Sequence, residues 1–245
     1  SWLKKSILMA NKITEAIILA GGLGTRLRSA VPDLPKCMAP VNGRPFVEYV
    51  INSLRKQGIQ KFVFALGYKS EAFDDFLNAV LPENEYTVSL EDEPLGTGGA
   101  VRLAASVTSN ENVLVTNGDT LFKADIQQVA AFHKSKSAEC TLSLKPMENF
   151  DRYGAVELDA EGRVKNFKEK QYFPEGLING GIYLLNVKAF QKKPFPEKFS
   201  FEKDYLEKYY TAGNIYGIAQ DAYFIDIGIP EDYERAQNEL KQGND

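Results

Sequence analysis

Three glycines and two cations follow a short apolar run near the start of the chain, and these residue types suggest phosphate chemistry. The run at 16–19 is apolar and rich in branched side chains, which is typical of a buried strand. It leads into residues 19–27, with the sequence Leu-Ala-Gly-Gly-Leu-Gly-Thr-Arg-Leu. Glycine lets a backbone approach a ligand closely, so that N–H groups can face phosphate oxygens. Arg26 and Lys36 add positive charge, and Pro35 stiffens the backbone beside Lys36, so we predict a triphosphate cradle.

Three other interpretations of these glycines are weaker. A P-loop requires Gly-x-x-x-x-Gly-Lys-Ser/Thr, and no lysine directly follows the glycines here. A dinucleotide fingerprint requires Gly-x-Gly-x-x-Gly, whereas Gly22 and Gly24 are followed by Leu27 at the third position. A tight turn with incidental surface cations would need fewer glycines than the three present.

Residues 21–27, together with Pro35 and Lys36, resemble the signature of the sugar-1-phosphate nucleotidyltransferases. Enzymes of that family join a nucleoside triphosphate to a sugar 1-phosphate and release pyrophosphate. The resemblance implies an α/β, three-layer, Rossmann-like nucleotide-diphospho-sugar transferase fold, with a mostly parallel mixed sheet and an added antiparallel acceptor subregion. It also implies nucleotide contacts from Leu19, Ala20, Gly21, Gly22, Gly24, Thr25, Arg26 and Lys36.

A second glycine cluster, in residues 91–100, follows an expected strand at 86–91. This segment resembles the base-recognition loop of the family, which implies that Gly96 and Thr97 lie near the base and ribose. Glu91 stands where relatives that use thymidine or uridine nucleotides usually carry glutamine. One carboxylate can accept hydrogen bonds from both N1–H and N2–H₂ of guanine, so Glu91, or else Glu93, favours GTP. The alternative for either residue is a solvated loop carboxylate.

Two aspartates directly follow apolar strands. Asp119 ends the sequence Asn-Gly-Asp after the strand at 113–116, and Asp226 follows an apolar run that begins at residue 222. Such an aspartate can simply cap a turn, but carboxylates can also hold Mg²⁺ together with substrate phosphates. The family carries a metal aspartate in a Gly-Asp pair, so the resemblance assigns Gly118 to the nucleotide site, and Asp119 and Asp226 to Mg²⁺.

Three short stretches in the second half resemble the sugar-phosphate site of the family. They are Tyr153-Gly154, residues 167–170 and residues 179–183. The resemblance implies backbone approach at Gly154, sugar hydroxyl contacts from Glu169 and Asn179, and neutralisation of the acceptor phosphate by Lys170. Taken singly, the three stretches could instead be a turn, a charged hairpin edge and a β-bulge.

Helix and strand patterns alternate through the first half, which favours a mostly parallel α/β sheet. Helices are expected at 45–57, after Ser70, at 125–136 and from Pro230, with a strand at 61–66. Antiparallel strands are expected at 139–145, 155–158 and 164–168. We expect one nucleotidyltransferase domain at 13–245, with its nucleotide half at 13–138 and its sugar-phosphate half at 139–245. Residues 1–12 are expected to be an N-terminal extension, of native or vector origin.

Composition excludes several classes of protein. The formal net charge of -4 over 245 residues argues against a general nucleic-acid-binding protein, since such proteins favour a basic face. No apolar run approaches the length of a membrane span, and the first eight residues lack a secretory pattern, so a cytoplasmic enzyme is expected. We expect Cys37 to be a packing residue and His133, the only histidine, to be solvated on a helix surface. The sequence leaves open a homo-oligomer.

The predicted reaction is attack by a sugar-1-phosphate oxygen on the α-phosphorus of GTP, with both substrates small molecules. Arg26 would stabilise the leaving pyrophosphate, Lys36 the nucleotide phosphates, and Lys170 the acceptor. Within the family, the variation at residues 28–31 and at Cys37 resembles most the D-glycero-α-D-manno-heptose 1-phosphate guanylyltransferases, which serve surface polysaccharide synthesis. The alternatives are a mannose-1-phosphate guanylyltransferase and a uridylyl-, thymidylyl- or cytidylyltransferase. A sugar-nucleotide-binding regulatory module is the non-enzyme alternative, and it should lack Arg26, Lys36 or a metal aspartate.

Overall fold

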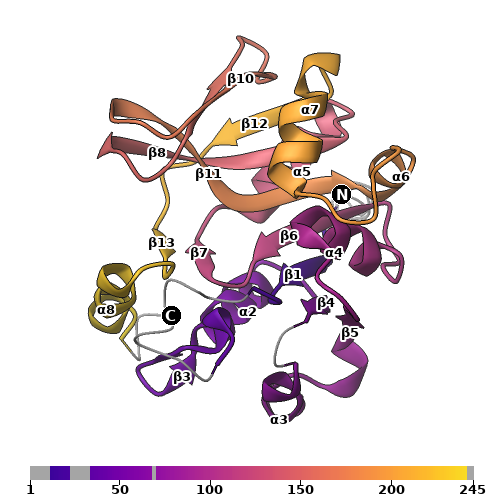
Figure 1. The fold of residues 1–245 in the computed structure, drawn as a ribbon, viewed down its shortest axis with the longest axis vertical. Coiled ribbons are helices and arrows are strands. Elements are labelled where there is room, and N and C mark those ends of the chain that lie inside the picture. The colour runs from indigo at the N-terminus through magenta and orange to yellow at the C-terminus, as the bar shows by residue number, and fades with distance from the viewer. Residues whose placement is uncertain (1–11, 23–33, 68–69, 242–245) are drawn as a thin grey trace, which may run out of the picture.

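A mixed seven-stranded sheet forms the centre of the computed structural model, which describes residues 12–22, 34–67 and 70–241 (Figure 1). The strand order is β12-β8-β11-β6-β1-β4-β5. The strands are β1 (Glu15–Leu19), β4 (Lys61–Leu66), β5 (Tyr86–Leu90), β6 (Asn112–Asn117), β8 (Cys140–Phe150), β11 (Phe173–Asn186) and β12 (Ile215–Ala219). Strands β6, β1, β4 and β5 are parallel, whereas β11 runs antiparallel to both β6 and β8. The fold is therefore the expected α/β architecture with added antiparallel strands.

Helices cover both faces of this sheet and make three layers. They are α2 (Phe46–Lys56), α3 (Glu71–Val80), α4 (Gly96–Ala105), α5 (Ile126–Ser135), α6 (Val187–Gln191), α7 (Glu207–Tyr209) and α8 (Pro230–Glu239). One apolar core contains Ile18 of β1 and buried residues of α2, α3, α5 and α8. The other contains the adjacent Ile17 with residues of α4 and α6. This alternation follows from strand geometry, because successive side chains point to opposite faces of a sheet.

Shorter elements complete the fold. Antiparallel pairs form between β2 (Pro40–Val41) and β3 (Arg44–Pro45), between β7 (Thr120–Phe122) and β13 (Phe224–Asp226), and between β9 (Ala155–Leu158) and β10 (Val164–Lys168). Short 3₁₀ turns lie at Lys36–Met38, Glu83–Glu85 and Tyr210–Ala212, and a π-helix lies at Phe201–Leu206. No helix among the described residues is long and apolar enough to cross a bilayer.

The sheet is longer in the second half than the sequence indicates. Strand β8 continues to Phe150 instead of ending near residue 145, and its partner β11 spans fourteen residues that include the Asn179 stretch. The pairing of these strands shifts between Asn179 and Tyr183, where Gly181 has a φ of +78°. The glycines interrupt the alternating pattern that would reveal a strand, because a bulge breaks the period of two.

His133 contradicts the expectation of a solvated histidine. Its residue is only 3% exposed, because the last turn of α5 packs against β8. Its Nδ1 lies 2.8 Å from the Thr141 hydroxyl, and its Nε2 lies 2.9 Å from Oδ1 of Asn112. Burial lowers the pKa of His133 to about 4, so the imidazole is neutral. It is a hydrogen-bonded core residue.

Candidate active site

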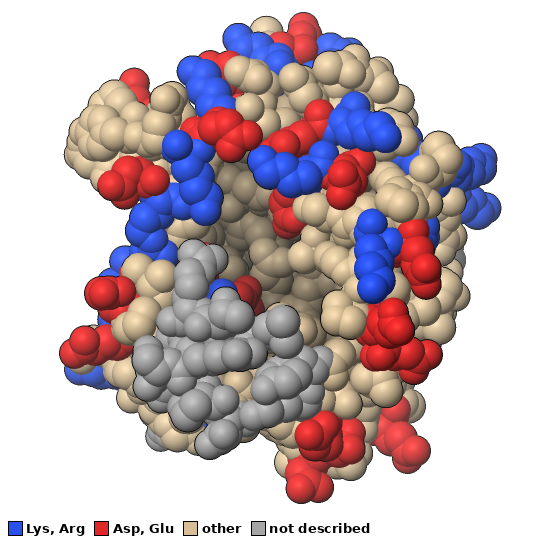
Figure 2. All heavy atoms as spheres, viewed as in Figure 1, with Lys and Arg blue, Asp and Glu red and all other residues tan. Residues whose placement is uncertain are grey.

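A cavity of about 400 Å³ lies at the carboxyl ends of the parallel strands, where open α/β sheets bind ligands. Figure 2 shows a hollow on one face of the molecule, with basic and acidic side chains along its rim. The cavity is lined by residues that follow β1, β5 and β6, by the 3₁₀ turn at Lys36 and by the start of α4. The predicted nucleotide residues that line it are Leu19, Ala20, Gly21, Gly22, Lys36, Glu91, Gly96 and Thr97, and the predicted metal ligand Asp119 lines it as well.

Gly118 lies directly behind this lining. Its N–H donates to the carbonyl of Leu19 at 2.8 Å, and a side chain at this position would crowd that carbonyl and Cys37. Cys37 is a free, buried thiol that also lines the cavity; burial raises its pKa, and the nearby Asp119 raises it further. It therefore stays protonated, as a packing residue should. Gly24, Thr25 and Arg26 lie outside the described residues.

One cation and two carboxylates lie close together at the cavity: Lys36 and Asp119 line it, and Asp226 lies near Lys36. Lys36 forms an ion pair with Asp119, which the β6–β7 connection presents. Asp226 ends β13, and its Oδ1 accepts from the N–H of Gly228 at 2.8 Å. A Cβ added to Gly228 would lie 2.9 Å from Asp226 Oδ1 and 3.1 Å from Lys36 Nζ, so these two groups flank the same glycine.

The charges around Asp226 bear on metal binding. Burial raises the pKa of Asp226 and the Asp119 carboxylate raises it further, whereas Lys36 lowers it. Among the residues that the structure describes, no group of three or more His, Cys, Asp or Glu side chains could hold a metal ion. Mg²⁺ usually takes only one or two protein carboxylates and completes its shell with water and substrate phosphates. Two neighbouring carboxylates beside a nucleotide cavity therefore fit Mg²⁺.

Glu91 and Glu93 have different surroundings. Glu91 follows β5 and lines the cavity, where burial raises its pKa and the N–H of Leu95 opposes that rise. Glu93 is exposed and forms an ion pair with Lys198 at 3.5 Å. Of the two carboxylates that the sequence left open, Glu91 is the one that lines the cavity.

A second cavity of about 290 Å³ lies beside β9, β10 and the bulge of β11. All four predicted sugar-phosphate residues line it: Gly154, Glu169, Lys170 and Asn179. A side chain at position 154 would overlap the carbonyl of Lys168, so only glycine lets this loop approach β10 so closely. Asn179 uses its amide internally, since it accepts from Gly181 at 2.9 Å and donates to the Tyr183 hydroxyl at 2.7 Å.

Comparison with known proteins identifies the family. The family model described as nucleotidyl transferase matches residues 15–243. The chain belongs to the nucleotidyl transferase family. This confirms the resemblance inferred from residues 21–27, Pro35 and Lys36.

Several individual proteins are similar to this nucleotidyl transferase. A D-glycero-alpha-D-manno-heptose 1-phosphate guanylyltransferase from Aneurinibacillus thermoaerophilus is 49% identical, over 93% of this chain and 98% of the relative. One of the same name from Campylobacter jejuni is 44% identical, over 89% of this chain and 96% of the relative. The crystal structure of HddC from Yersinia pseudotuberculosis superposes with a TM-score of 0.83 at 37% identity, covering 94% of this chain and all of that one. A second HddC structure, complexed with GMP-PN, has a TM-score of 0.81 at 35% identity and covers the same shares.

Glu202 is a site residue of this nucleotidyl transferase that the sequence did not reveal. It lies in the π-helix and lines both cavities. Its Oε2 accepts from the Thr97 hydroxyl at 3.2 Å, and its Oε1 accepts from the Tyr183 hydroxyl at 3.5 Å. Thr97 belongs to the nucleotide cavity, and Tyr183 holds Asn179 of the second cavity. No local pattern marks Glu202, because its role depends on a contact across 105 residues of sequence.

Proposed function

We propose that this chain transfers GMP from GTP to D-glycero-α-D-manno-heptose 1-phosphate and releases pyrophosphate. The observation that carries the proposal is the 49% identity, over nearly the full length of both chains, with a relative of that name. The geometry supports the same reaction, because the nucleotide cavity and the second cavity share Glu202 in their linings.

The residues of this chain would act by positioning and charge neutralisation. Glu91 accepts hydrogen bonds from guanine, and the backbone at Gly21 and Gly22 faces the phosphates. Lys36 neutralises the phosphate charge near the reacting phosphorus. In the second cavity, Lys170 neutralises the acceptor phosphate, and Glu169 and Asn179 contact the sugar. The attacking phosphate oxygen is already ionised at neutral pH, so the reaction needs no general base.

We further propose that Asp119 and Asp226 hold Mg²⁺. When bound, the ion would supply neutralisation of the negative charge that the two phosphate groups bring together. Lys36 already pairs with Asp119, so the substrate phosphates would draw this lysine toward themselves and leave the aspartate to the ion. Arg26 is proposed to stabilise the leaving pyrophosphate.

The test is pyrophosphate release with Mg²⁺ from GTP, ATP, CTP, UTP or dTTP. Each is paired with heptose, mannose or glucose 1-phosphate. We expect turnover only with GTP and the heptose substrate. A preference for mannose 1-phosphate would instead support the second candidate, for which a Mycobacterium tuberculosis mannose-1-phosphate guanylyltransferase, 33% identical over 96% of this chain and 67% of that protein, is the precedent. Nucleotide-sugar binding without any release would indicate a regulatory module.

Recognition of the guanine base by Glu91 can be tested with a single variant. Glu91→Gln should lower kcat/KM for GTP by about 10-fold to 100-fold, because a doubly hydrogen-bonded base contact contributes roughly 1–3 kcal/mol of discrimination. Glu93→Gln is the matched control, since Glu93 pairs with Lys198 outside the cavity lining. Equal GTP kinetics in both variants would contradict the role of Glu91.

A further inference from the structure

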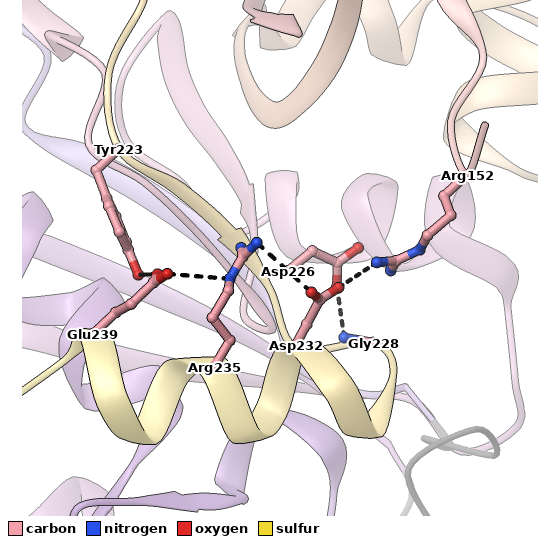
Figure 3. Close-up of polar contacts among 7 residues, drawn as sticks. All are labelled: Arg152, Tyr223, Asp226, Gly228, Asp232, Arg235 and Glu239. Atoms are coloured by element: carbon pink, nitrogen blue, oxygen red, sulfur yellow. Dashed lines mark hydrogen bonds and ion pairs between the residues drawn. The ribbon is translucent and has the colours of Figure 1, made fainter. Parts of the chain in front are cut away.

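A chain of polar contacts runs along α8, as Figure 3 shows. Asp232 joins two arginines: its Oδ2 pairs with Arg152, and its Oδ1 lies 3.8 Å from Arg235. Arg235 also forms an ion pair with Glu239 at 3.4 Å, and the Tyr223 hydroxyl donates to Glu239 at 2.6 Å. Four of these five residues belong to α8 or to the segment that enters β13. Arg152 is the exception, because it comes from the loop between β8 and β9.

The Arg152 loop is a wall of the second cavity. Residues 153–156 line that cavity, and Gly154 is the position where only glycine fits against β10. The Arg152 guanidinium carbon lies 5.6 Å from the centre of the Tyr153 ring. The Tyr153 ring in turn packs edge-on against Phe224 of β13, with 6.1 Å between ring centres.

The Arg152 loop contacts the chain on both sides of Asp226, through the Tyr153–Phe224 ring contact and the Arg152–Asp232 ion pair. Phe224 comes two residues before Asp226, and Asp232 comes six residues after it. Asp226 also interacts favourably with the charge of Arg152. The Arg152 loop is thus attached to the strand that enters the Asp226 turn and to the helix that leaves it.

One partner of this ion pair, Asp232, is more shielded from solvent than in an ordinary surface pair. Exposed pairs often contribute nothing measurable. Here the Asp232 side chain is only 13% exposed, while that of Arg152 is 39% exposed. Removing Arg152 would leave the mostly buried Asp232 carboxylate with the more distant Arg235 as its remaining cation partner among the described ion pairs. Loss of the nearer partner of such a carboxylate lowers the stability of the fold around it.

We propose that Arg152 is a positioning residue: its ion pair with Asp232 holds the loop at Gly154 in a set position relative to the Asp226 turn. The proposal rests on the proposed function, in which the second cavity binds the sugar 1-phosphate and Asp226 lies at the reaction centre. The acceptor oxygen must meet the nucleotide in line, and a small displacement between these two parts lowers the rate strongly. Neither Arg152 nor Asp232 lines the nucleotide cavity, so we expect nucleotide binding not to depend on the pair.

The kinetic test compares Arg152→Gln, Asp232→Asn and the double variant. In each single variant we expect kcat/KM for the sugar 1-phosphate to fall about 10-fold or more, as misplacement from outside the reacting centre does. KM for GTP should stay within about twofold of wild type. The double variant should have a kcat/KM no lower than that of the less active single variant, as expected for two residues that act as one pair. Arg152→Lys should recover part of the loss.

Arg235→Gln is the matched control. It removes the other cation partner of Asp232 and an α8 contact, and the ion pairs described for Arg235 stay within α8 and do not include the acceptor loop. We expect it to lower the melting temperature while leaving both KM values unchanged. The positioning role is wrong if Arg235→Gln and Arg152→Gln lower kcat/KM for the sugar 1-phosphate equally. It is also wrong if Arg152→Gln raises KM for GTP as much as KM for the sugar 1-phosphate.

Amide hydrogen exchange separates this inference from the proposed function, because it needs no turnover. In Arg152→Gln, peptides covering 151–156 and 224–229 should exchange faster, while peptides covering 86–98 should not change. If wild type shows no turnover with any substrate pair, the proposed function fails and the exchange data decide the inference alone. Unchanged exchange at 224–229 would overturn it.

Discussion

Lys36, Asp119 and Asp226 form a cluster beside the nucleotide cavity in which carboxylates outnumber the cation. The lysine pairs with Asp119 and flanks Gly228 together with Asp226, so within this cluster one cation lies against two carboxylates, and the charge of Arg152 adds a smaller favourable interaction with Asp226. Burial raises the pKa of Asp226, and Asp119 raises it further. A bound cation would lower the pKa of Asp226 again, because positive charge favours the ionised form. This imbalance is the residue-level reason for expecting a divalent metal here.

At the same scale, the buried His133 predicts how the free energy of unfolding depends on pH. In the unfolded chain the His133 imidazole titrates near 6.5, whereas in the folded protein burial lowers the pKa of this imidazole to about 4. The unfolded chain therefore binds more protons between these values, so the free energy of unfolding falls as pH drops from 6.5 towards 4. The full loss is roughly 3 kcal/mol, from about 1.4 kcal/mol per pKa unit.

Nuclear magnetic resonance can measure this titration in tag-free protein, because the chain has only one histidine. The imidazole signals should stay those of the neutral ring down to about pH 5, with the Nε2–H form donating to Asn112. His133→Gln should flatten the pH dependence of stability in this window. A measured pKa at or above 6.5 would contradict the buried assignment.

At the scale of elements, the start of α4 is shaped by the segment at 195–200. Gly96 has a φ of +73°, and the backbone on either side of it bonds to this segment. The carbonyl of Leu95 accepts from the N–H of Phe199 at 3.1 Å, and the N–H of Gly98 donates to the carbonyl of Phe199 at 2.9 Å. Phe199 is buried and stacks on Phe195 with 4.2 Å between ring centres. The base-loop glycines therefore have a packing role as well as a proposed ligand role, because they admit this aromatic pair against the helix.

Gly98→Ala tests that packing. The added methyl group would overlap the Phe199 ring, and overpacking of a buried site costs about 1–3 kcal/mol. Alanine's better helix propensity returns up to about 1 kcal/mol, so we expect a net loss of roughly 1–2 kcal/mol in denaturant unfolding. Gly22→Ala is the control, because none of the residues that the structure describes lies within 4 Å of its Cβ position. Equal stability of the two variants would show that Phe199 moves aside without cost.

At the scale of the whole molecule, one sheet carries both cavities. Strand β6 of the first half pairs with β11 of the second, and β11 pairs with β8. Glu202 then joins the cavities through Thr97 and Tyr183. The two cavities are therefore parts of a single packed structure, which suits the proposed reaction, because that reaction must hold two phosphates in line.

Ligand-linked stability tests this arrangement without measuring turnover. GTP should raise the melting temperature, since a ligand at about 100 times its Kd stabilises the folded state by roughly 2.7 kcal/mol. ATP at the same concentration should give a much smaller shift, because adenine lacks the adjacent donors that Glu91 would accept. Equal shifts with GTP and ATP would contradict base recognition in the cavity.

Local pattern was sufficient for much of the site. The strand-then-glycine sequence at 16–22, the Gly118-Asp119 pair and Pro230 at the first turn of α8 were predictable, because each depends on backbone preferences over a few residues. The four residues of the second cavity were predicted from short stretches that resemble the family, and the structure places all four in the lining of that cavity.

Tertiary structure alone decided which of these stretches meet. It placed Asp226 beside Lys36, selected Glu91 over Glu93 for the cavity, buried His133 and extended β8 and β11. It also revealed Glu202 and Arg152, whose contacts span 105 and 80 residues of sequence. The physical reason is that the order of strands in a sheet brings distant residues together. Charge, burial and hydrogen bonding between those residues arise only after the sheet has formed.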